Sequence, residues 1–199
     1  MANFVVNKCM NLIKTSKPEL SSTDLEVIQY GLHGLYLSLT KVVVLIVASY
    51  ILGQLREFIF FILVFTILRT NSYGLHTSKS WVCWVTTIPI FIIFPRIALI
   101  TTIPIYIKVI LGGSACLYIF KYSPADTKKR PIINKKIRKR HKILATITAI
   151  IFVIISIISQ NNFISNVFFL CLLLICFSIS PQTYKLFKMP YNNYLNYMS

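Results

Sequence analysis

Acidic residues are scarce in this chain, whose 199 residues include five Asp and Glu against 21 Lys and Arg. Enzymes that hold catalytic metal ions with carboxylates, lipid transferases among them, need several acids close together. The acids here are scattered along the sequence: Glu19, Asp24, Glu26, Glu57 and Asp126. This scarcity argues against a lipid transferase, and we expect no metal ion in the functional site.

Paired cysteines are missing as well. The sequence has no Cys-x-x-Cys and no cluster of Cys and His, which argues against a zinc site and a disulfide framework. We therefore expect no cofactor. Acids also fall where the apolar region of a secretory signal peptide would lie, so we expect no signal peptide. The five cysteines stand apart, mostly inside apolar runs: Cys9, Cys83, Cys116, Cys171 and Cys176.

Apolar residues, by contrast, are abundant: 56% of the chain is hydrophobic and the mean hydropathy is +0.70. Long apolar runs predict an all-α integral membrane protein, a single polytopic domain over residues 1–199. The run 58–68 gives only about 17 Å of helix against a hydrocarbon core of about 30 Å. It spans only if its polar flanks are drawn in or the bilayer thins. Six transmembrane helices, several short or kinked by proline, are expected at 35–55, 58–68, 81–94, 97–120, 143–159 and 163–179.

The net charge of +16 alone suggests nucleic acid, but the basic residues lie between apolar runs. That is the pattern of cytoplasmic loops beside anionic lipid, so we expect membrane lipids and no nucleic acid as partners. With six spans and both termini in the cytoplasm, the basic residues concentrate on the cytoplasmic side. If the run 58–68 did not cross, the same count would put the most basic loop outside. The polar segments are 1–34, which holds N-terminal helices, 69–80, the basic loop 121–142 and the tail 180–199.

One polar interval offers a potential base and a potential nucleophile together, His76 and Cys83. A thiol needs such a base to attack at neutral pH. On one uninterrupted helix, seven residues would separate the pair by about 10 Å, too far for a hydrogen bond of about 3 Å. We therefore expect His76 on a loop, after the permissive Gly74, and Cys83 near the start of the next helix. The alternative is a solvated histidine and an inert cysteine packed in an apolar helix.

Two lysines fall within the expected spans. Lys41 lies near a cytoplasmic end, where its side chain can reach the interface. Lys108 lies in mid-membrane, which makes it a functional candidate; it could instead face a wet crevice, or the fourth span could be two half-length pieces. A non-enzymatic peptide transporter or channel subunit is the competing class of function. In such a protein, transport would depend on Lys108 and the kinked helices, and Cys83 would have no chemical role.

Two motifs together resemble the AgrB family of membrane endopeptidases. The first is Arg69, then Gly74-Leu-His76, then Cys83 at the head of a membrane helix. The second is Tyr122-Ser-Pro-Ala-Asp-Thr-Lys-Lys-Arg-Pro-Ile132, which is similar to the basic loop of that family. The resemblance covers most of residues 25–180. One departure is the polar stretch 70–73, where the family usually has further basic or His residues, so we expect a different choice of substrate.

The resemblance implies a bacterial cysteine endopeptidase in the cell membrane, with its active site on the cytoplasmic side. Its substrate would be an AgrD-type propeptide, from which it removes the C-terminal tail and promotes thiolactone or lactone cyclisation through a thioester. It further implies Cys83 as nucleophile, His76 as general base, Arg69 and Gly74 as supporting residues, and a homodimer. The basic loop is either solvated against lipid head groups or a docking surface for an acidic peptide. The candidates for binding substrate are Lys128, Lys129, Arg130, Lys41 and Lys108.

Overall fold

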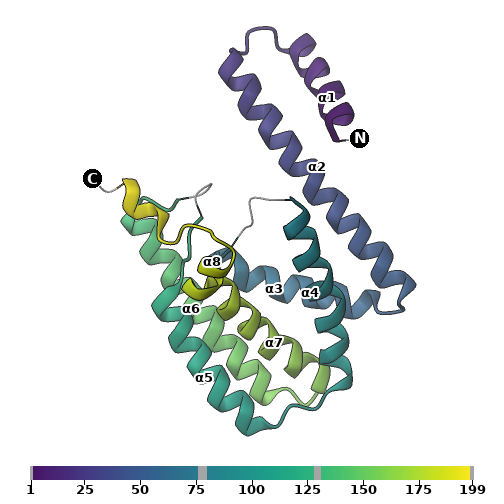
Figure 1. The fold of residues 1–199 in the computed structure, drawn as a ribbon. Helices are drawn as coiled ribbons and strands as arrows, with labels where there is room; N and C mark the ends of the chain where they lie inside the picture. The colour runs from purple at the N-terminus through teal and green to yellow at the C-terminus, as the bar shows by residue number, and fades with distance from the viewer. Residues whose placement is uncertain (1, 76–79, 128–130, 198–199) are drawn as a thin grey trace. The chain divides into compact units, whose positions relative to one another are not determined.

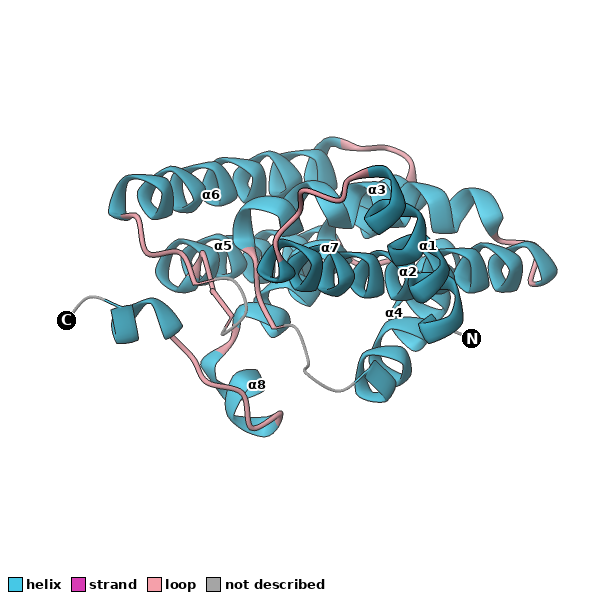
Figure 2. Ribbon diagram, turned by 90° about the horizontal axis from the view of Figure 1, so that it is seen from above, coloured by secondary structure: helices cyan, strands magenta, loops and turns pink. Residues whose placement is uncertain are grey.

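The computed structural model of the chain consists of helices joined by short segments (Figures 1 and 2). It describes residues 2–75, 80–127 and 131–197. No β-strand forms among these residues, which confirms the predicted all-α integral membrane protein. The helices are α1 (Ala2–Ser16), α2 (Ser22–Ile51), α3 (Leu55–Ser72), α4 (Ser80–Ile100), α5 (Ile105–Tyr122), α6 (Lys135–Ile158), α7 (Asn162–Ile179) and α8 (Pro181–Leu186), with a 3-10 helix at Asn193–Tyr197.

The chain divides into two units, residues 1–51 and 52–199. In the first unit α1 packs against α2, and Val6 and Met10 of α1 are buried. The helix α2 begins where the Ser21 hydroxyl accepts the Asp24 N–H and donates to its carboxylate, at 2.6 Å. Such local hydrogen bonds satisfy donors that a helix start leaves free.

Five of the described helices are long and apolar enough to cross a membrane: α2, the part of α4 from Cys83, α5, α6 and α7. The helix α7 lies at the centre of the second unit, because it contacts α3, α4, α5 and α6. In its apolar window, 56% of the residues are buried, against at most 22% in the other four. A helix that is apolar all round belongs inside a bundle.

The short apolar run 58–68 forms the middle of α3, which is not among those five. Polar residues at both ends, from Arg56 to Ser72, are drawn into the helix and lengthen it to 18 residues. One face of α3 packs into the core of the second unit through Phe58, Phe61, Val64 and Leu68. The ring of Phe91 on α4 lies 6.0 Å from that of Phe61, edge to face.

The break between the third and fourth expected spans was predicted at Pro95–Arg96, and this prediction was wrong. The helix α4 continues through Pro89 and Pro95 to Ile100, and the chain leaves it only at residues 101–104. Asn166 of α7 stabilises this later end, since its side-chain amide donates to the carbonyls of Ala98, at 3.1 Å, and Thr101, at 2.7 Å. These bonds satisfy carbonyls that the end of a helix leaves without partners.

Candidate active site

The residues directly before His76 are held by backbone hydrogen bonds to two distant segments. The Gly74 N–H donates to the Ala125 carbonyl at 2.8 Å, and the Ala125 N–H donates to the Ser72 carbonyl at 3.0 Å. The Leu75 N–H donates to the Ser178 carbonyl at 2.8 Å. These bonds join the end of α3, the segment after α5 and the end of α7. We call the set of residues 72–75, 125 and 178 the junction.

Arg69 and Gly74, the two predicted supporting residues, meet in the junction. Arg69 reaches from the last turn of α3, donating from Nη2 to the Leu75 carbonyl at 2.6 Å and from Nη1 to the Ser178 hydroxyl. Gly74 is buried with φ +113°, a conformation that side chains rarely adopt. An added Cβ would lie 2.5 Å from both Arg69 Nη1 and Ser178 Oγ. Only glycine fits at this position.

The helix α8 supports the junction from the other side. The Tyr184 hydroxyl lies 3.1 Å from the carbonyl oxygens of both Ala125 and Asp126, and its side chain is buried. Burial raises the pKa of the Tyr184 phenol, which keeps the hydroxyl protonated and able to donate. The Asp126 carboxylate is buried too, and accepts the N–H of Tyr194 at 2.8 Å. The motif that follows α5 is thereby fixed to the C-terminal segment.

Cys83 lies near the start of α4, where the sequence predicts it, and is partly buried. Its Sγ is 3.8 Å from Thr87 Oγ1, one helical turn further on. His76 lies outside the described residues and follows directly on Leu75, the last anchored residue.

Of the remaining predicted residues, Lys108 is the one that the structure describes in the same unit as the junction, and it does not lie at the junction. Residues 128–130, which hold the predicted Lys128, Lys129 and Arg130, lie outside the described residues, and Lys41 lies on α2 in the first unit. Lys108 is buried in the first turn of α5, with Nζ donating to Ser165 Oγ at 2.6 Å. It is separated from the last residue of α5 by about 20 Å of helix. A role for these residues in substrate binding stays a prediction.

Two side-chain groups in or next to the junction, Ser178 and His141, were not predicted. Ser178 accepts from Arg69 and lies 109 positions further along the chain. His141 of α6 lies with Nδ1 3.2 Å from Asn71 Oδ1 and Nε2 3.4 Å from the Tyr73 hydroxyl. The rings of Tyr73 and His141 meet edge to face at 5.1 Å. No sequence spacing links these positions, because α3, α6 and α7 meet only through tertiary packing.

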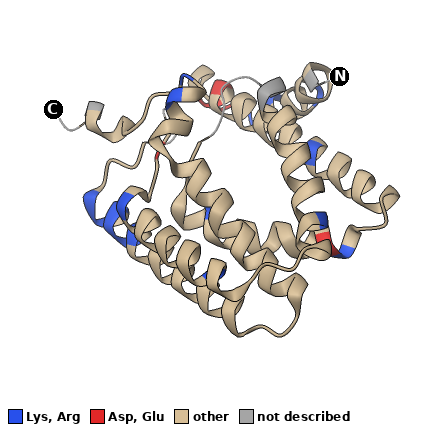
Figure 3. Ribbon diagram, turned by 60° about the horizontal axis from the view of Figure 1, so that its bottom comes forward, with Lys and Arg blue, Asp and Glu red and all other residues tan. Residues whose placement is uncertain are grey.

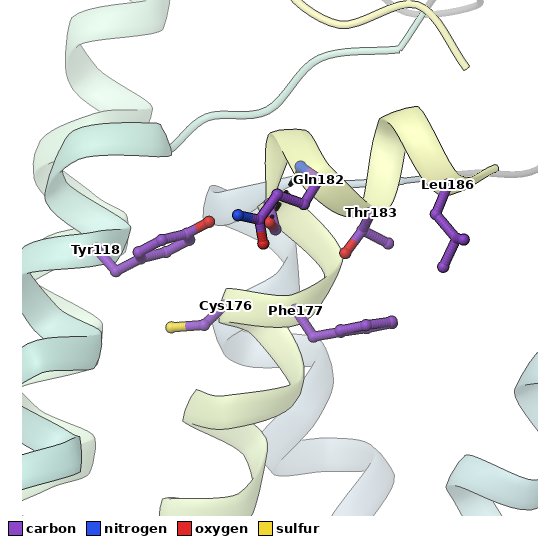
Figure 4. Close-up of a pocket in the computed structure, with 7 residues that line it drawn as sticks. Tyr118, Cys176, Phe177, Gln182, Thr183 and Leu186 are labelled. Carbon is purple, nitrogen blue, oxygen red and sulfur yellow. Dashed lines mark hydrogen bonds between the residues drawn. The ribbon is translucent and has the colours of Figure 1, made fainter. Parts of the chain in front are cut away.

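A pocket of about 540 Å³ lies next to the junction, between α5, α7 and α8 (Figure 4). Its wall continues directly from Ser178, since Phe177 and Ser180 belong to it. In Figure 4 the side chain of Gln182 faces Tyr118 across the opening. The lining therefore mixes apolar groups with polar ones: Tyr118, Cys176, Phe177, Ser180, Gln182, Thr183 and Leu186.

The helices and this site define a multi-pass helical membrane protein with a cysteine near the start of one span and an anchored glycine turn shortly before it. The model of one family, accessory gene regulator B, matches residues 6–179, and the chain belongs to that family. Membership places the protein in the agr quorum-sensing system.

Named relatives span most of the chain. A putative AgrB-like protein of Clostridium acetobutylicum is 26% identical over 179 residues, covering 90% of this chain and 86% of the relative. A putative AgrB-like protein of Listeria innocua is 30% identical over 172 residues, covering 85% and 83%. The accessory gene regulator protein B of Staphylococcus carnosus is 35% identical over 96 residues, covering 48% of this chain and 50% of the relative. No solved structure matches the chain.

Proposed function

We propose that the protein is a membrane cysteine endopeptidase of the agr system, acting on an AgrD-type propeptide at the cytoplasmic face of the cell membrane. It removes the C-terminal tail of the propeptide and promotes closure of a thiolactone or lactone ring. The observation that carries this proposal is the junction, which anchors the backbone up to Leu75, one residue before His76. A general base must be held within hydrogen-bonding reach of the proton that it removes.

In the first step His76 takes the proton of the Cys83 thiol as Sγ attacks the carbonyl carbon of the scissile bond. The carbon–nitrogen bond then breaks, and the imidazolium gives its proton to the departing amine. The tail leaves with a new amino terminus. The retained part of the propeptide stays on Cys83 as a thioester.

In the second step a thiol or hydroxyl within the retained part attacks the thioester carbonyl. The bond to Cys83 Sγ breaks, the attacking group loses its proton to His76, and the cysteine is restored. Exclusion of water protects the thioester until the ring closes. The position of Cys83, near the start of an apolar helix and partly buried, is consistent with such shielding.

Arg69 and Ser178 act in this scheme as positioning residues rather than as reacting groups. The guanidinium bonds the Leu75 carbonyl and the Ser178 hydroxyl at once, so it fixes the direction in which the chain enters His76. A buried hydrogen bond to a charged group contributes about 1.5–3 kcal/mol. Loss of the two Arg69 hydrogen bonds would misplace the general base and lower the rate of the chemical step.

Intact mass spectrometry of the purified protein with a panel of AgrD-type propeptides tests the proposal. We expect a covalent adduct on the wild type that hydroxylamine removes and that Cys83→Ala lacks. His76→Ala should form the adduct at least 100-fold more slowly, the scale of a lost general base. The control Cys9→Ala, on α1, should behave as wild type.

Cleavage that persists in Cys83→Ala would contradict the assignment. The competing transporter function is tested with Lys108→Ala, which removes a buried cation from the second unit. If that change abolished release of a peptide from cells while every cysteine variant released it normally, the peptidase proposal would be wrong.

A further inference from the structure

A second hollow, of about 350 Å³, lies between the junction and the start of α6. Tyr73 forms the wall on the junction side. Ile133 and Ile137 are 47% and 49% exposed, so the hollow has an apolar rim that is open to its surroundings. The other lining residues come from the segment that enters α6: Pro131, Ile132 and Asn134.

Exposed basic residues lie on the helix that begins at this hollow. The first two turns of α6 carry Lys135, Lys136, Lys139 and Arg140, all exposed, and its first turn has no acidic residue. Cations are unfavourable near the N-terminus of a helix, where the dipole is positive. In Figure 3 the blue residues of the second unit gather mainly toward this end of α6. An anionic partner would relieve this repulsion.

Asp126 is the acidic residue nearest to α6 in the sequence, but it does not neutralise the positive charges at the start of that helix. The Asp126 carboxylate is buried and accepts the N–H of Tyr194. The side chain of Asn134 instead satisfies the helix start by accepting from the N–H groups of Lys136, at 2.9 Å, and Ile137, at 3.3 Å. The cap fixes the backbone of Lys136 and Ile137 at the start of α6, and Asn134 and Ile137 both line the hollow.

The wall of the hollow belongs to the candidate active site. Tyr73 has φ +58°, forms a backbone bridge with Ala125, and contacts His141 through its hydroxyl at 3.4 Å. It stands three residues before His76 in the sequence. A peptide bound in the hollow would therefore lie beside the anchored segment that leads to the proposed general base.

We propose that this hollow is a docking subsite for an acidic peptide segment with one apolar side chain. The apolar side chain enters between Tyr73, Ile133 and Ile137, and the carboxylates of the segment meet the exposed lysines and arginine of α6. The identification of this peptide as the propeptide's own tail rests on the proposed function. The docking surface consists of Tyr73, Ile133 and Ile137 together with the exposed basic residues of the first two turns of α6.

A lipid fits the same surface less well. Ile137 precedes the apolar run that starts at Ile143 by six residues, about 9 Å along the helix. An acyl chain buried in the hydrocarbon core would not reach the hollow, whereas a peptide lying along the cytoplasmic interface would. The volume of about 350 Å³ is at the small end of ligand pockets and is ample for one apolar side chain with part of its peptide backbone.

The test measures fluorescence anisotropy of labelled ten-residue peptides on full-length protein in phosphatidylcholine nanodiscs. Two peptides each carry four Glu and differ only in a central Leu or Ser, and the protein carries Cys83→Ala so that binding is measured without cleavage. We expect the Leu peptide to bind about tenfold more tightly, because its side chain is buried. Ile137→Ser should bring this ratio close to one, and Ile133→Ser should lower it independently.

The charges are tested with Lys136→Glu, against the matched control Lys14→Glu on the exposed face of α1. We expect Lys136→Glu to weaken both peptides by about threefold and to flatten their dependence on salt, while the control changes neither. Equal binding of the two peptides, or a Leu-to-Ser ratio that survives both isoleucine changes, would overturn the proposal. So would a Lys136→Glu effect confined to retention on phosphatidylglycerol vesicles, which would assign the charges to lipid.

Discussion

Gly74 is the residue on which the geometry of the site depends most directly. Its buried backbone lies against the hydrogen-bonded Arg69 guanidinium and Ser178 hydroxyl, and its φ of +113° lies in a region that favours glycine. The same residue bonds the Ala125 carbonyl, so any shift there moves the motif that follows α5 as well. A single methyl group would disturb three segments at once.

We therefore expect Gly74→Ala to lower the processing of an AgrD-type propeptide at least 100-fold. The added Cβ would lie 2.5 Å from Arg69 Nη1 and Ser178 Oγ, and strained backbone of this kind costs about 1–3 kcal/mol. Cleavage is measured by the electrophoretic mobility of a tagged propeptide in cells. The matched control is Gly113→Ala, where an added Cβ meets nothing within 4 Å. Normal processing by Gly74→Ala would show that the junction does not position the base.

At the scale of elements, α8 and the segment that follows it hold the junction from the C-terminal side. Tyr184 and Tyr191 pack edge to face with ring centroids 5.0 Å apart. The guanidinium of Arg138, on α6, lies 3.6 Å from the centroid of the Tyr194 ring, a stabilising cation–π contact. These contacts link the tail to the start of α6 as well as to Asp126.

Alkaline pH should release this C-terminal segment. Burial raises the pKa of Tyr191 to about 12, against a usual value near 10, with Arg138 lowering it in part. Because the folded-state pKa is raised, the stabilisation is fully present below pH 10 and is lost as the pH rises toward 12. The thermal unfolding temperature of the protein in detergent should fall across this window.

The variant Tyr191→Phe should show a smaller fall between pH 10 and 12, because one partly buried phenol no longer ionises. Tyr197→Phe, at a side chain that is 54% exposed, serves as the control and should fall as the wild type does. Lysines also titrate in this range, but they do so in all three proteins. An equal fall in Tyr191→Phe and wild type would contradict the expected role of burial.

At the scale of the whole molecule, the properties that the sequence predicts are those set by composition and local spacing. Apolar runs predict the spanning helices, and the position of Cys83 near a helix start follows from the run beginning at Trp81. The end of α4 was misplaced because its later position depends on Asn166, which bonds it from 65 or more positions away. The sequence did not predict the roles of Ser178, Tyr184 and His141 for the same reason. Hydrogen bonds between packed helices follow no sequence period.

The number of crossings decides on which side the functional segments lie. The five candidate spans alone would place the two termini on opposite sides, whereas a crossing by α3 as well places them together. The 18 residues of α3 give about 27 Å of helix, close to the thickness of the core. Lys8, Lys14 and Lys17 before α2 and the many Lys and Arg of the basic loop 121–142 both favour the cytoplasmic side, and of the two arrangements only six crossings put both segments there.

Cysteine labelling in intact cells tests this arrangement, with all five native cysteines replaced. We introduce single cysteines at four exposed positions: Lys14→Cys, Lys139→Cys, Gln160→Cys and Lys188→Cys. A maleimide that does not cross membranes should label Gln160→Cys in intact cells and the other three only after permeabilisation. Labelling of Lys14→Cys but not Lys188→Cys in intact cells would mean that α3 does not cross. Labelling of Lys139→Cys in intact cells would put the start of α6 outside, away from a propeptide made in the cytoplasm. That result would contradict both the proposed cytoplasmic active site and the docking subsite beside it.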